Sequence, residues 1–507
     1  MSKFEKKLNE AYEKEMAFED QSELAKSKAG VEEKQTIRPR KRLSIGKKLA
    51  LGFGIGGTLV LVLAVAGLAM LVTGAHFESH KSVKNYRENF ALTQIKRMDQ
   101  DTFRRINDIE YPDDGTLRPV AEEYQRAVNE FAYTIYEGLD VKEDKFFSPL
   151  SLYTHLDLLS HATDDVNIKE GLDELLALEE SKRSAEFNNA FLSNRVAGGE
   201  NFSSIEMDDG AFFDFRYGAN PEYLDYLTGK YVECFEMDFQ KKKDVSLMQQ
   251  WAKEKLRGME IAEDDLGLRD DLIFTLISTL HFKGKWGFNK ANTYEDDFHY
   301  PNGETAKIPF MHDTFYGKVY QYDDYVSVDE HFRGGYSMQL LVPNKVEDDI
   351  FSLVEGRNWL INDESRLAKY EVYSGFESSD WVVKMAIPRF ESESKYQFSE
   401  VIPALNEKAG KLYEKYSLSI AHAFNVPKEN LDYAYLGETT QANQIYWDEE
   451  GATATTYTIS QGYGKATSAM SSEGVYEINL DQPFLYVSRD RNNLPIYVGR
   501  VDHPKKA

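Results

Sequence analysis

One stretch of 27 residues, 49–75, contains no charged side chain and divides the chain into two unequal parts. About 20 consecutive apolar residues in a helix span the hydrocarbon core of a bilayer. The glycines in the stretch are also common in membrane helices. A basic cluster lies directly before it, and such clusters favour the cytoplasmic side. We therefore expect a transmembrane helix at residues 49–75, with the N-terminus in the cytoplasm and the rest of the chain outside the cell.

Cleavage as a secretory signal peptide is the competing interpretation of this stretch, because Thr73-Gly74-Ala75 is a passable cleavage site. A signal peptide has an apolar core of only about 7–15 residues, and it follows a short basic segment. The run here is longer, and 48 residues precede it. An uncleaved membrane anchor therefore explains the pattern better.

The composition of the flanking regions sets the other expected boundaries. Residues 1–48 mix lysine with glutamate, which predicts a charged cytoplasmic tail. Residues 76–119 are polar with scattered apolar positions, which predicts an extracellular stalk or linker. From residue 120 to residue 507 apolar residues recur regularly, as in a globular domain. The predicted protein is thus a single-pass membrane protein with one large extracellular domain.

Charge and side-chain chemistry exclude several classes of function. The net charge of −25 argues against binding to nucleic acid, which needs clustered lysine and arginine. The single cysteine, Cys234, excludes an internal disulfide and is expected to be buried. The sequence lacks a Gly-x-Ser-x-Gly elbow, and His155 and His161 are spaced too far apart to share a helix face for a metal. We expect no enzyme, no cofactor and no metal.

Apolar spacing in the globular region predicts a mixture of helices and strands without a regular βαβ repeat. A helix is expected over residues 128–139, and Ser148 with Pro149 has the pattern of a helix cap and first turn. The fold class is therefore α+β with mainly antiparallel sheets. Further helices are expected at 221–228, 246–258 and 398–405, and strands at 210–216, 272–282, 337–342, 382–390, 484–489 and 496–501.

A segment near the C-terminus alternates small and larger residues with a period of two. Ala452, Ala454, Thr456, Thr458 and Ser460 are all small, followed by two glycines at 462 and 464. As a strand this segment would have a narrow face suited to a packed core and a broad face toward solvent. Its glycines also indicate a loop. The pattern fits an ordinary threonine-rich edge strand, or a loop that is able to become a strand.

Six motifs in order resemble the serpin family, over about residues 120–504. No single motif is decisive, but their order and spacing together are specific. They are Phe147-Ser148-Pro149-Leu150-Ser151, Glu236-Met237-Asp238-Phe239, Trp251 to Gly258, His281-Phe282-Lys283-Gly284-Lys285-Trp286 with Pro309-Phe310-Met311, Met385-Ala386-Ile387-Pro388-Arg389-Phe390, and Gln482-Pro483-Phe484-Leu485 with Val498-Gly499-Arg500-Val501.

The resemblance implies a serpin-like fold of three mainly antiparallel β-sheets and eight or nine helices. It also implies an exposed reactive-centre loop between Glu450 and Pro483 that a serine protease cleaves. The cleaved loop then enters the central sheet as an extra strand and traps the protease. The expected partner is an extracellular serine protease, and the protein is expected to be a monomer.

Counting from the hinge glycine as in serpins places the scissile bond between Lys465 and Ala466, with Tyr463 and Met470 as alternatives. Lysine at this position favours a trypsin-like protease. The resemblance implies a sheet-opening region at Ser148, Ser151, Gln441 and Trp286, where Gln441 takes the place of a histidine found in many serpins. The expected hinge and inserting strand comprise Glu449, Glu450, Gly451, Ala452, Thr453, Ala454, Thr455, Thr456, Tyr457 and Thr458.

Two other functions stay open at this point. The segment from Lys465 to Pro483 is about seven residues longer than the common serpin pattern, and Gln441 is a departure. A non-inhibitory serpin domain that acts as a cell-surface binding module would tolerate both. A membrane-linked sensor that passes loop cleavage to the cytoplasmic tail would also tolerate them. The small alternating face of the loop favours the inhibitor.

Overall fold

A computed structural model gives the structure of the protein. All described residues lie within the unit 76–507 of the chain. Among them no helix is long and apolar enough to cross a bilayer, and the anchor predicted at 49–75 lies outside them. The described residues are 96–97, 120–139, 146–195, 203–256, 271–286, 288, 290–300, 302–345, 350–354, 360, 381–449, 451–454 and 475–504.

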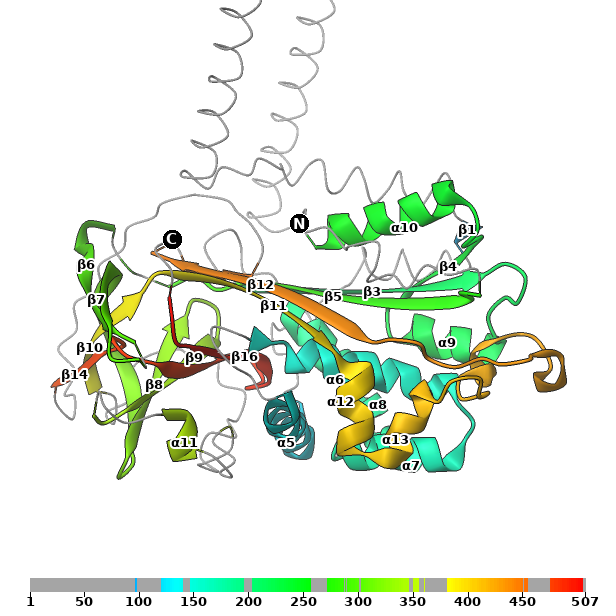
Figure 1. Ribbon diagram of the computed structural model, residues 1–507, viewed down its shortest axis with the longest axis horizontal. Helices are drawn as coiled ribbons and strands as arrows, with labels where there is room; N and C mark the ends of the chain where they lie inside the picture. The colour runs from blue at the N-terminus through cyan, green and yellow to red at the C-terminus, as the bar shows by residue number, and fades with distance from the viewer. Residues whose placement is uncertain are drawn as a thin grey trace, which may run out of the picture. The chain divides into compact units, whose positions relative to one another are not determined.

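A seven-stranded sheet runs through the centre of the domain (Figure 1). The pair β3–β4 is parallel, and the other pairs are antiparallel. The short β1 comes from the range predicted as a stalk and pairs with β4 at one edge. In spatial order the strands are β1 (Lys96–Arg97), β4 (Glu233–Met237), β3 (Ser204–Asp214), β5 (Phe274–Lys283), β13 (Gly451–Ala454), β12 (Thr440–Asp448) and β11 (Phe390–Gln397).

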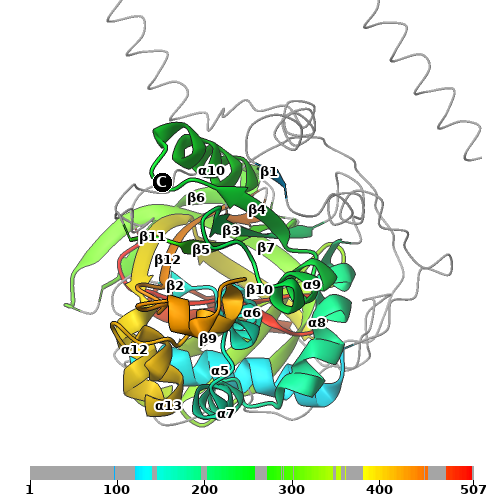
Figure 2. The ribbon, with the colours of Figure 1, turned by 90° about the vertical axis from the view of Figure 1, so that its right-hand side faces the viewer.

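Helices cover both faces of this sheet. On one face α10 (Lys242–Lys255) packs through Trp251 against Phe212, Phe235 and Ile277. The main hydrophobic core fills the opposite face, where Figure 2 shows α5, α6, α8 and α9. Cys234 is fully buried there, as the sequence analysis predicted for a single cysteine. The remaining bounds are α5 (Glu122–Leu139), α6 (Pro149–Leu159), α7 (Val166–Leu175), α8 (Glu180–Arg195), α9 (Pro221–Gly229), α11 (Ile350–Val354), α12 (Phe398–Leu405) and α13 (Glu407–Gly410).

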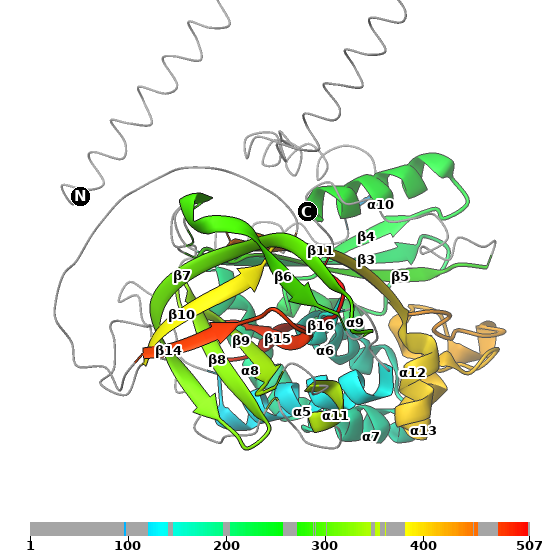
Figure 3. The same cartoon turned by 60° about the vertical axis from the view of Figure 1, so that its left-hand side comes forward.

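The other strands form a second hydrogen-bonded group. Three sheets were expected, but the described strands form two groups because β7 (Thr305–Gln321) is long enough to belong to two arrays. Residues 305–317 of β7 pair with β6 and β10, and its last four residues, 318–321, pair with β8 (Figure 3). The members besides β7 are β2 (Phe146–Phe147), β6 (Thr293–His299), β8 (Tyr325–Phe332), β9 (Tyr336–Pro343), β10 (Trp381–Pro388), β14 (Val475–Asn479), β15 (Phe484–Arg489) and β16 (Pro495–Val501).

The described residues thus contain nine α-helices and two groups of mainly antiparallel strands, which confirms the α+β class. The start of α6 is also confirmed. Ser148 precedes the helix in an extended conformation, its hydroxyl accepts a hydrogen bond from the Ser151 amide, and Pro149 occupies the first turn. This cap fixes the direction in which α6 runs beneath the central sheet.

Candidate functional site

The hinge of the predicted loop lies inside the central sheet. After β12 the chain reverses within two residues, and β13 pairs with β12 on one side and β5 on the other. Ala452, the first small residue of the alternating series, is 1% exposed. On the neighbouring β12, Trp447, which pairs with Ala452, is fully buried, whereas the next residue, Tyr446, is 38% exposed, so the two faces of the sheet differ in burial here. The first four residues of the loop, expected to be exposed, therefore form a strand.

Gly451 is required for this reversal. Its φ is +148°, a backbone region that residues with a side chain rarely adopt. A Cβ built at this position would lie 1.7 Å from the carbonyl oxygen of Gly284 on the neighbouring segment. The two chains meet closely because the Gly284 amide donates to the Ala452 carbonyl oxygen over 2.7 Å. The hinge glycine therefore allows β13 to enter the sheet.

The Glu449 carboxylate fastens the start of the hinge. Its side chain is 2% exposed and forms an ion pair with the guanidinium of Arg389. Oε1 of Glu449 also accepts a hydrogen bond from the Thr293 hydroxyl. Burial acts to raise the pKa of Glu449, but the hydrogen bonds from Thr293 and Arg389 outweigh it and lower that pKa below its usual value. The carboxylate is therefore ionised at neutral pH and ties the hinge to the ends of β6 and β10.

Trp286 closes the same end of the sheet. Its indole N–H donates to the Asp448 carbonyl oxygen over 2.6 Å, directly before the hinge. The ring packs edge-on against Trp447 and stacks on Phe332. Trp286 therefore holds the turn between β12 and β13, at a distance along the sheet from the Ser148 region with which it was grouped in the sequence.

An open slot continues the line of β13. Within the described part of the sheet, no strand lies between β5 and β12 beyond Ala454. A cavity of about 370 Å³ occupies this position. Residues 271–278 line one wall and residues 433–444 line the other, while Ser148, Ser151, Leu152 and His155 of the α6 region lie along its floor. The slot has the position of a missing strand.

Gln441 and Ser148 meet at the floor of the slot, as the sequence suggested. The Ser148 amide donates to Gln441 Oε1 over 2.8 Å, and Gln441 Nε2 donates to the Ser148 carbonyl oxygen over 2.9 Å. A glutamine amide is able to form this paired contact because it carries both a donor and an acceptor. Ser151 lies beside the pair, since its amide donates to the Ser148 hydroxyl. The Gln441 side chain therefore connects β12 to the start of α6, at the position where many serpins have a histidine.

Three contact residues of the site escaped the sequence analysis in different ways. Arg389 was quoted within a motif, but nothing in the sequence paired it with Glu449. Thr293 belongs to the serpin-like spacing that follows His281–Trp286, but nothing in the sequence paired it with Glu449. His155 was considered only as a metal ligand, whereas its Nδ1 lies 2.9 Å from the Ser278 hydroxyl of β5. In the described residues no group of three or more potential metal ligands occurs.

Several predicted site residues lie outside the described residues. They are Glu450, Thr455, Thr456, Tyr457 and Thr458 of the inserting strand, the bond between Lys465 and Ala466, and the alternatives Tyr463 and Met470.

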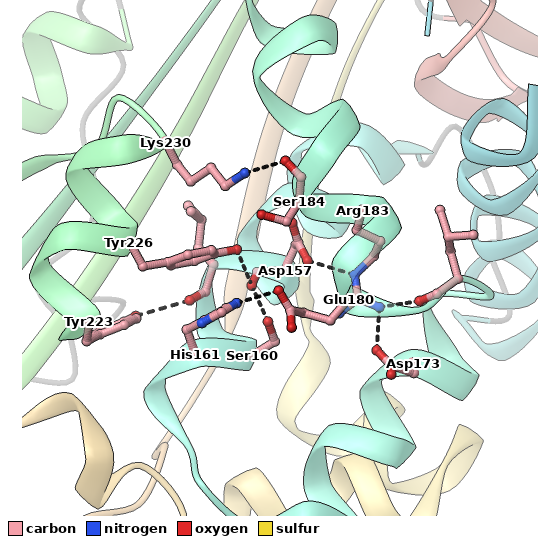
Figure 4. Close-up of polar contacts among 12 residues, drawn as sticks. Asp157, Ser160, His161, Asp173, Glu180, Arg183, Ser184, Tyr223, Tyr226 and Lys230 are labelled. Carbon is pink, nitrogen blue, oxygen red and sulfur yellow. Dashed lines mark hydrogen bonds and ion pairs between the residues drawn. The ribbon is translucent and has the colours of Figure 1, made fainter. Parts of the chain in front are cut away.

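A second polar cluster lies away from the slot, between α6, α8 and α9 (Figure 4). The Arg183 guanidinium is completely buried and donates to Asp157 over 2.7 Å and to Asp173 over 2.6 Å. His161 stacks on Tyr226 and lies 2.8 Å from the Glu180 carboxylate. These contacts join helices to one another. We assign the cluster a structural role.

Comparison with known proteins agrees with this architecture. The sequence profile described as serpin (serine protease inhibitor) matches residues 126–504. The chain belongs to the serpin family. An uncharacterized serpin-like protein of Thermococcus kodakarensis is 24% identical over 402 residues, which are 77% of this chain and 87% of that protein.

Two solved serpin structures, one of a native serpin and one of a cleaved serpin, share the fold of this chain. The native state of tengpin, a thermophilic serpin, aligns with a TM-score of 0.61 at 16% identity, covering 81% of this chain and all of tengpin. Cleaved serpin 42Da also aligns with a TM-score of 0.61, at 18% identity, covering 76% of this chain and 99% of that one.

A substitution at the hinge tests the close contact in this serpin. Gly451→Ala is expected to displace β13, because the new Cβ has no room beside Gly284. Amide hydrogen exchange at Gly284, which donates to Ala452, should then become about tenfold faster or more. Gly437→Ala is the matched control, because its Cβ would have no neighbour within 4 Å. Unchanged exchange in the Gly451 variant would contradict the role of the glycine.

Proposed function

We propose that this serpin inhibits an extracellular serine protease, which cleaves the loop and is trapped when the loop enters the slot. The observation that carries the proposal is the placement of β13. The hinge is already paired between β5 and β12, and an open slot lies directly ahead of it. Further insertion of the loop would extend β13 beyond Ala454 into the slot between β5 and β12.

The length of the slot supports the proposed extent of insertion. Each further residue of the loop would lie one residue earlier on both β5 and β12, because both pairings with β13 are antiparallel. Residue 455 would then lie level with His281 and Gln444. Lys465 would lie level with Asp271 and Ala434, at the far end of the cavity walls. In this register residue 459 would be the last one level with β12, at Thr440, and residue 462 the last one level with β5, at Phe274, while the cavity walls continue to the level of Lys465.

Insertion over this length would release considerable free energy. A strand between two neighbours makes hydrogen bonds along both edges. At about 1 kcal/mol net for each bond, some 12–14 inserted residues would contribute on the order of 10–20 kcal/mol before side-chain burial. A displacement of about 1 Å within a protease active site is able to slow its chemistry about 100-fold. The expected energy is therefore sufficient to hold a protease in a distorted state.

Trypsin is the first protease to test, because a lysine side chain at the scissile bond fits an acidic specificity pocket. The full-length chain in detergent is expected to form an adduct with trypsin that survives SDS. Lys465→Glu should remove the adduct, whereas Lys428→Glu, at an exposed lysine elsewhere in the domain, should leave it. Cleavage at Lys465 with trypsin activity unimpaired would overturn the inhibitory function.

The proposed membrane tether rests on the uncharged run at residues 49–75 and on the basic cluster before it. It would hold the inhibitor at the outer surface of the cell. When the full chain is expressed, protease added to intact cells should remove the domain while leaving the N-terminal tail protected. Recovery of the full-length chain in the soluble fraction would contradict the tether.

A cell-surface binding module or a cleavage sensor is the second candidate. The replacement of histidine by Gln441 and the extended segment after Lys465 favour it. Both alternatives predict loop cleavage without a trapped protease. The adduct experiment therefore distinguishes them from the inhibitor.

A further inference from the structure

Exposed apolar side chains lie at the end of the central sheet opposite the hinge. β3 and β4 finish at this end, and β5 and β12 begin there (Figure 1, right-hand side). Phe215, directly after β3, is 52% exposed. In the segment before β12, Tyr416 is 72% exposed and Leu418 is 37% exposed. Tyr416 packs edge-on against Tyr433, whose hydroxyl donates to the Asp271 carboxylate just before β5 over 3.2 Å.

Three consecutive exposed lysines, Lys241, Lys242 and Lys243, lie at the same end, where the chain passes from β4 to α10. Nζ of Lys241 is 5.8 Å from the centre of the Phe215 ring and 3.2 Å from the Asp238 carboxylate. Lys242 and Lys243 form no ion pair with any residue that the structure describes. Positive charge is unfavourable at the start of a helix, because the helix dipole is positive there. The stability of α10 therefore does not explain these lysines.

The chain that leads back to the uncharged run also leaves the fold from this end. β1 pairs antiparallel with β4, with Lys96 level with Glu236 and Arg97 level with Phe235. Going back along the chain from Arg97 to Lys96 therefore moves toward Met237, the last residue of β4. From there 20 residues connect β1 to the end of the uncharged run. The chain thus departs for its proposed anchor from the end that carries the lysines.

We propose that this end of the domain rests on the anionic phospholipid headgroups of the membrane. The inference rests on the proposed function, because the proposed tether brings the domain to the lipid. Aromatic side chains favour the membrane–water interface, and clustered lysines are attracted to anionic lipids. The net charge of −25 favours approach to an anionic surface by the lysine-bearing end. This basal surface comprises Phe215, Lys241, Lys242, Lys243, Tyr416 and Leu418.

Contact at the basal surface would set the orientation of the domain, which a tether alone does not. β12 runs from Thr440 at the basal end to Asp448 at the hinge, and its nine residues span about 30 Å. The hinge would then be held about that far from the headgroups, on the side of the domain that faces away from the lipid. The start of the loop would be accessible to proteases outside the cell.

Energy transfer to labelled lipid tests this orientation in the full-length chain, reconstituted in nanodiscs of phosphatidylcholine and phosphatidylglycerol. The only cysteine, Cys234, is fully buried, so an introduced cysteine takes a dye selectively. Gln240→Cys places the dye beside the basal lysines, and Asn302→Cys places it in the turn between β6 and β7, at the opposite end (Figure 1). Transfer to a headgroup acceptor should be about threefold or more greater from position 240 than from position 302.

Charge reversal separates the basal surface from a general effect of charge. Lys242→Glu combined with Lys243→Glu should abolish the excess transfer from position 240, as should high salt or phosphatidylcholine alone. Lys307→Glu combined with Lys384→Glu is the matched control, because it makes the same change in net charge at two exposed lysines on other strands, and should leave the excess. Equal transfer from positions 240 and 302, or an excess that survives reversal of the basal lysines, would overturn the proposal.

Failure of the tether is distinguishable from failure of the basal surface. If the full-length chain does not enter nanodiscs, the proposed tether is wrong. Co-sedimentation of the same chain with phosphatidylglycerol vesicles then decides on the basal surface alone. Binding that is lost in the Lys242→Glu, Lys243→Glu variant would support the surface, whereas absent binding, or binding that this variant leaves unchanged, would overturn it.

Discussion

Under the proposed inhibitory function, replacing Thr458 with arginine is expected to convert this serpin into a substrate of its target protease. In the register of β13 an inserted residue 458 would lie between Ser278 and Gln441, above His155. An arginine there would bury a charge without a carboxylate partner, at a cost of several kcal/mol. The stoichiometry of inhibition of trypsin should rise about tenfold or more, because each 1.4 kcal/mol changes the partition by a factor of ten.

The neighbouring residue supplies the matched control for this variant. Tyr457 would lie level with Ala442, an exposed residue of β12, so that its side chain would be on the solvent side. Tyr457→Arg should therefore leave the stoichiometry close to that of the natural chain. An unchanged stoichiometry in Thr458→Arg, measured beside this control, would contradict strand insertion in the proposed register.

Arg183→Met is expected to destabilise the domain by about 3–5 kcal/mol. The substitution removes the partner of Asp157, whose side chain is 1% exposed, and leaves a buried carboxyl group uncompensated. Burial already raises the pKa of Asp157 even though Arg183 acts to lower it. The measurement is the shift in the midpoint of urea unfolding. Replacing both partners, as in Arg183→Met with Asp157→Leu, should recover part of the loss, because apolar side chains carry no such penalty.

The adjacent ion pair gives the control for Arg183. Lys182 lies 2.9 Å from Glu123, and both side chains are about half exposed. Exposed pairs contribute little to stability because solvent screens them, so Lys182→Met should barely move the unfolding midpoint. Equal effects of the Lys182 and Arg183 substitutions would show that burial of the pair has no energetic importance.

Local patterns allowed parts of this structure to be predicted from the sequence. Ser148 and Pro149 marked the start of α6, because capping depends on adjacent residues only. The alternating small residues indicated which face of the hinge segment is buried, and Ala452 lies on that face. Gly451 was expected to be part of a loop from its residue type, and the name of hinge came from the resemblance to serpins; its φ of +148° at the reversal explains why a glycine stands there.

Strands with charged outer faces were missed. In β11, Glu391, Glu393 and Lys395 alternate with buried or half-buried residues, so that the segment is not apolar enough to be picked out as a strand. The long β7 was also missed, and the number of separate sheets therefore could not be foreseen. Strand pairing depends on partners far along the chain, and a single sequence does not display them.

Contacts between distant segments could not be predicted from local patterns, and the one between Gln441 and Ser148 was expected only through the resemblance to serpins. His155 and Ser278 are separated by 123 residues, and Arg389 and Glu449 by 60. Taken alone, each of these residue types is most often found at the protein surface, so its sequence position gives no sign of a partner. Only the fold, by laying α6 under β5 and the end of β10 beside the hinge, gives these side chains their partners.

The pairing of β1 with β4 limits how far the domain is able to lie from the proposed membrane anchor. With the anchor that we propose, 20 residues lie between Ala75 and Lys96, and at about 3.5 Å each they reach at most about 70 Å. With that anchor, a segment of this length would keep β1 within about 70 Å of the membrane surface. Proteases bound to the same surface would then meet the domain at a higher effective concentration than proteases in the medium.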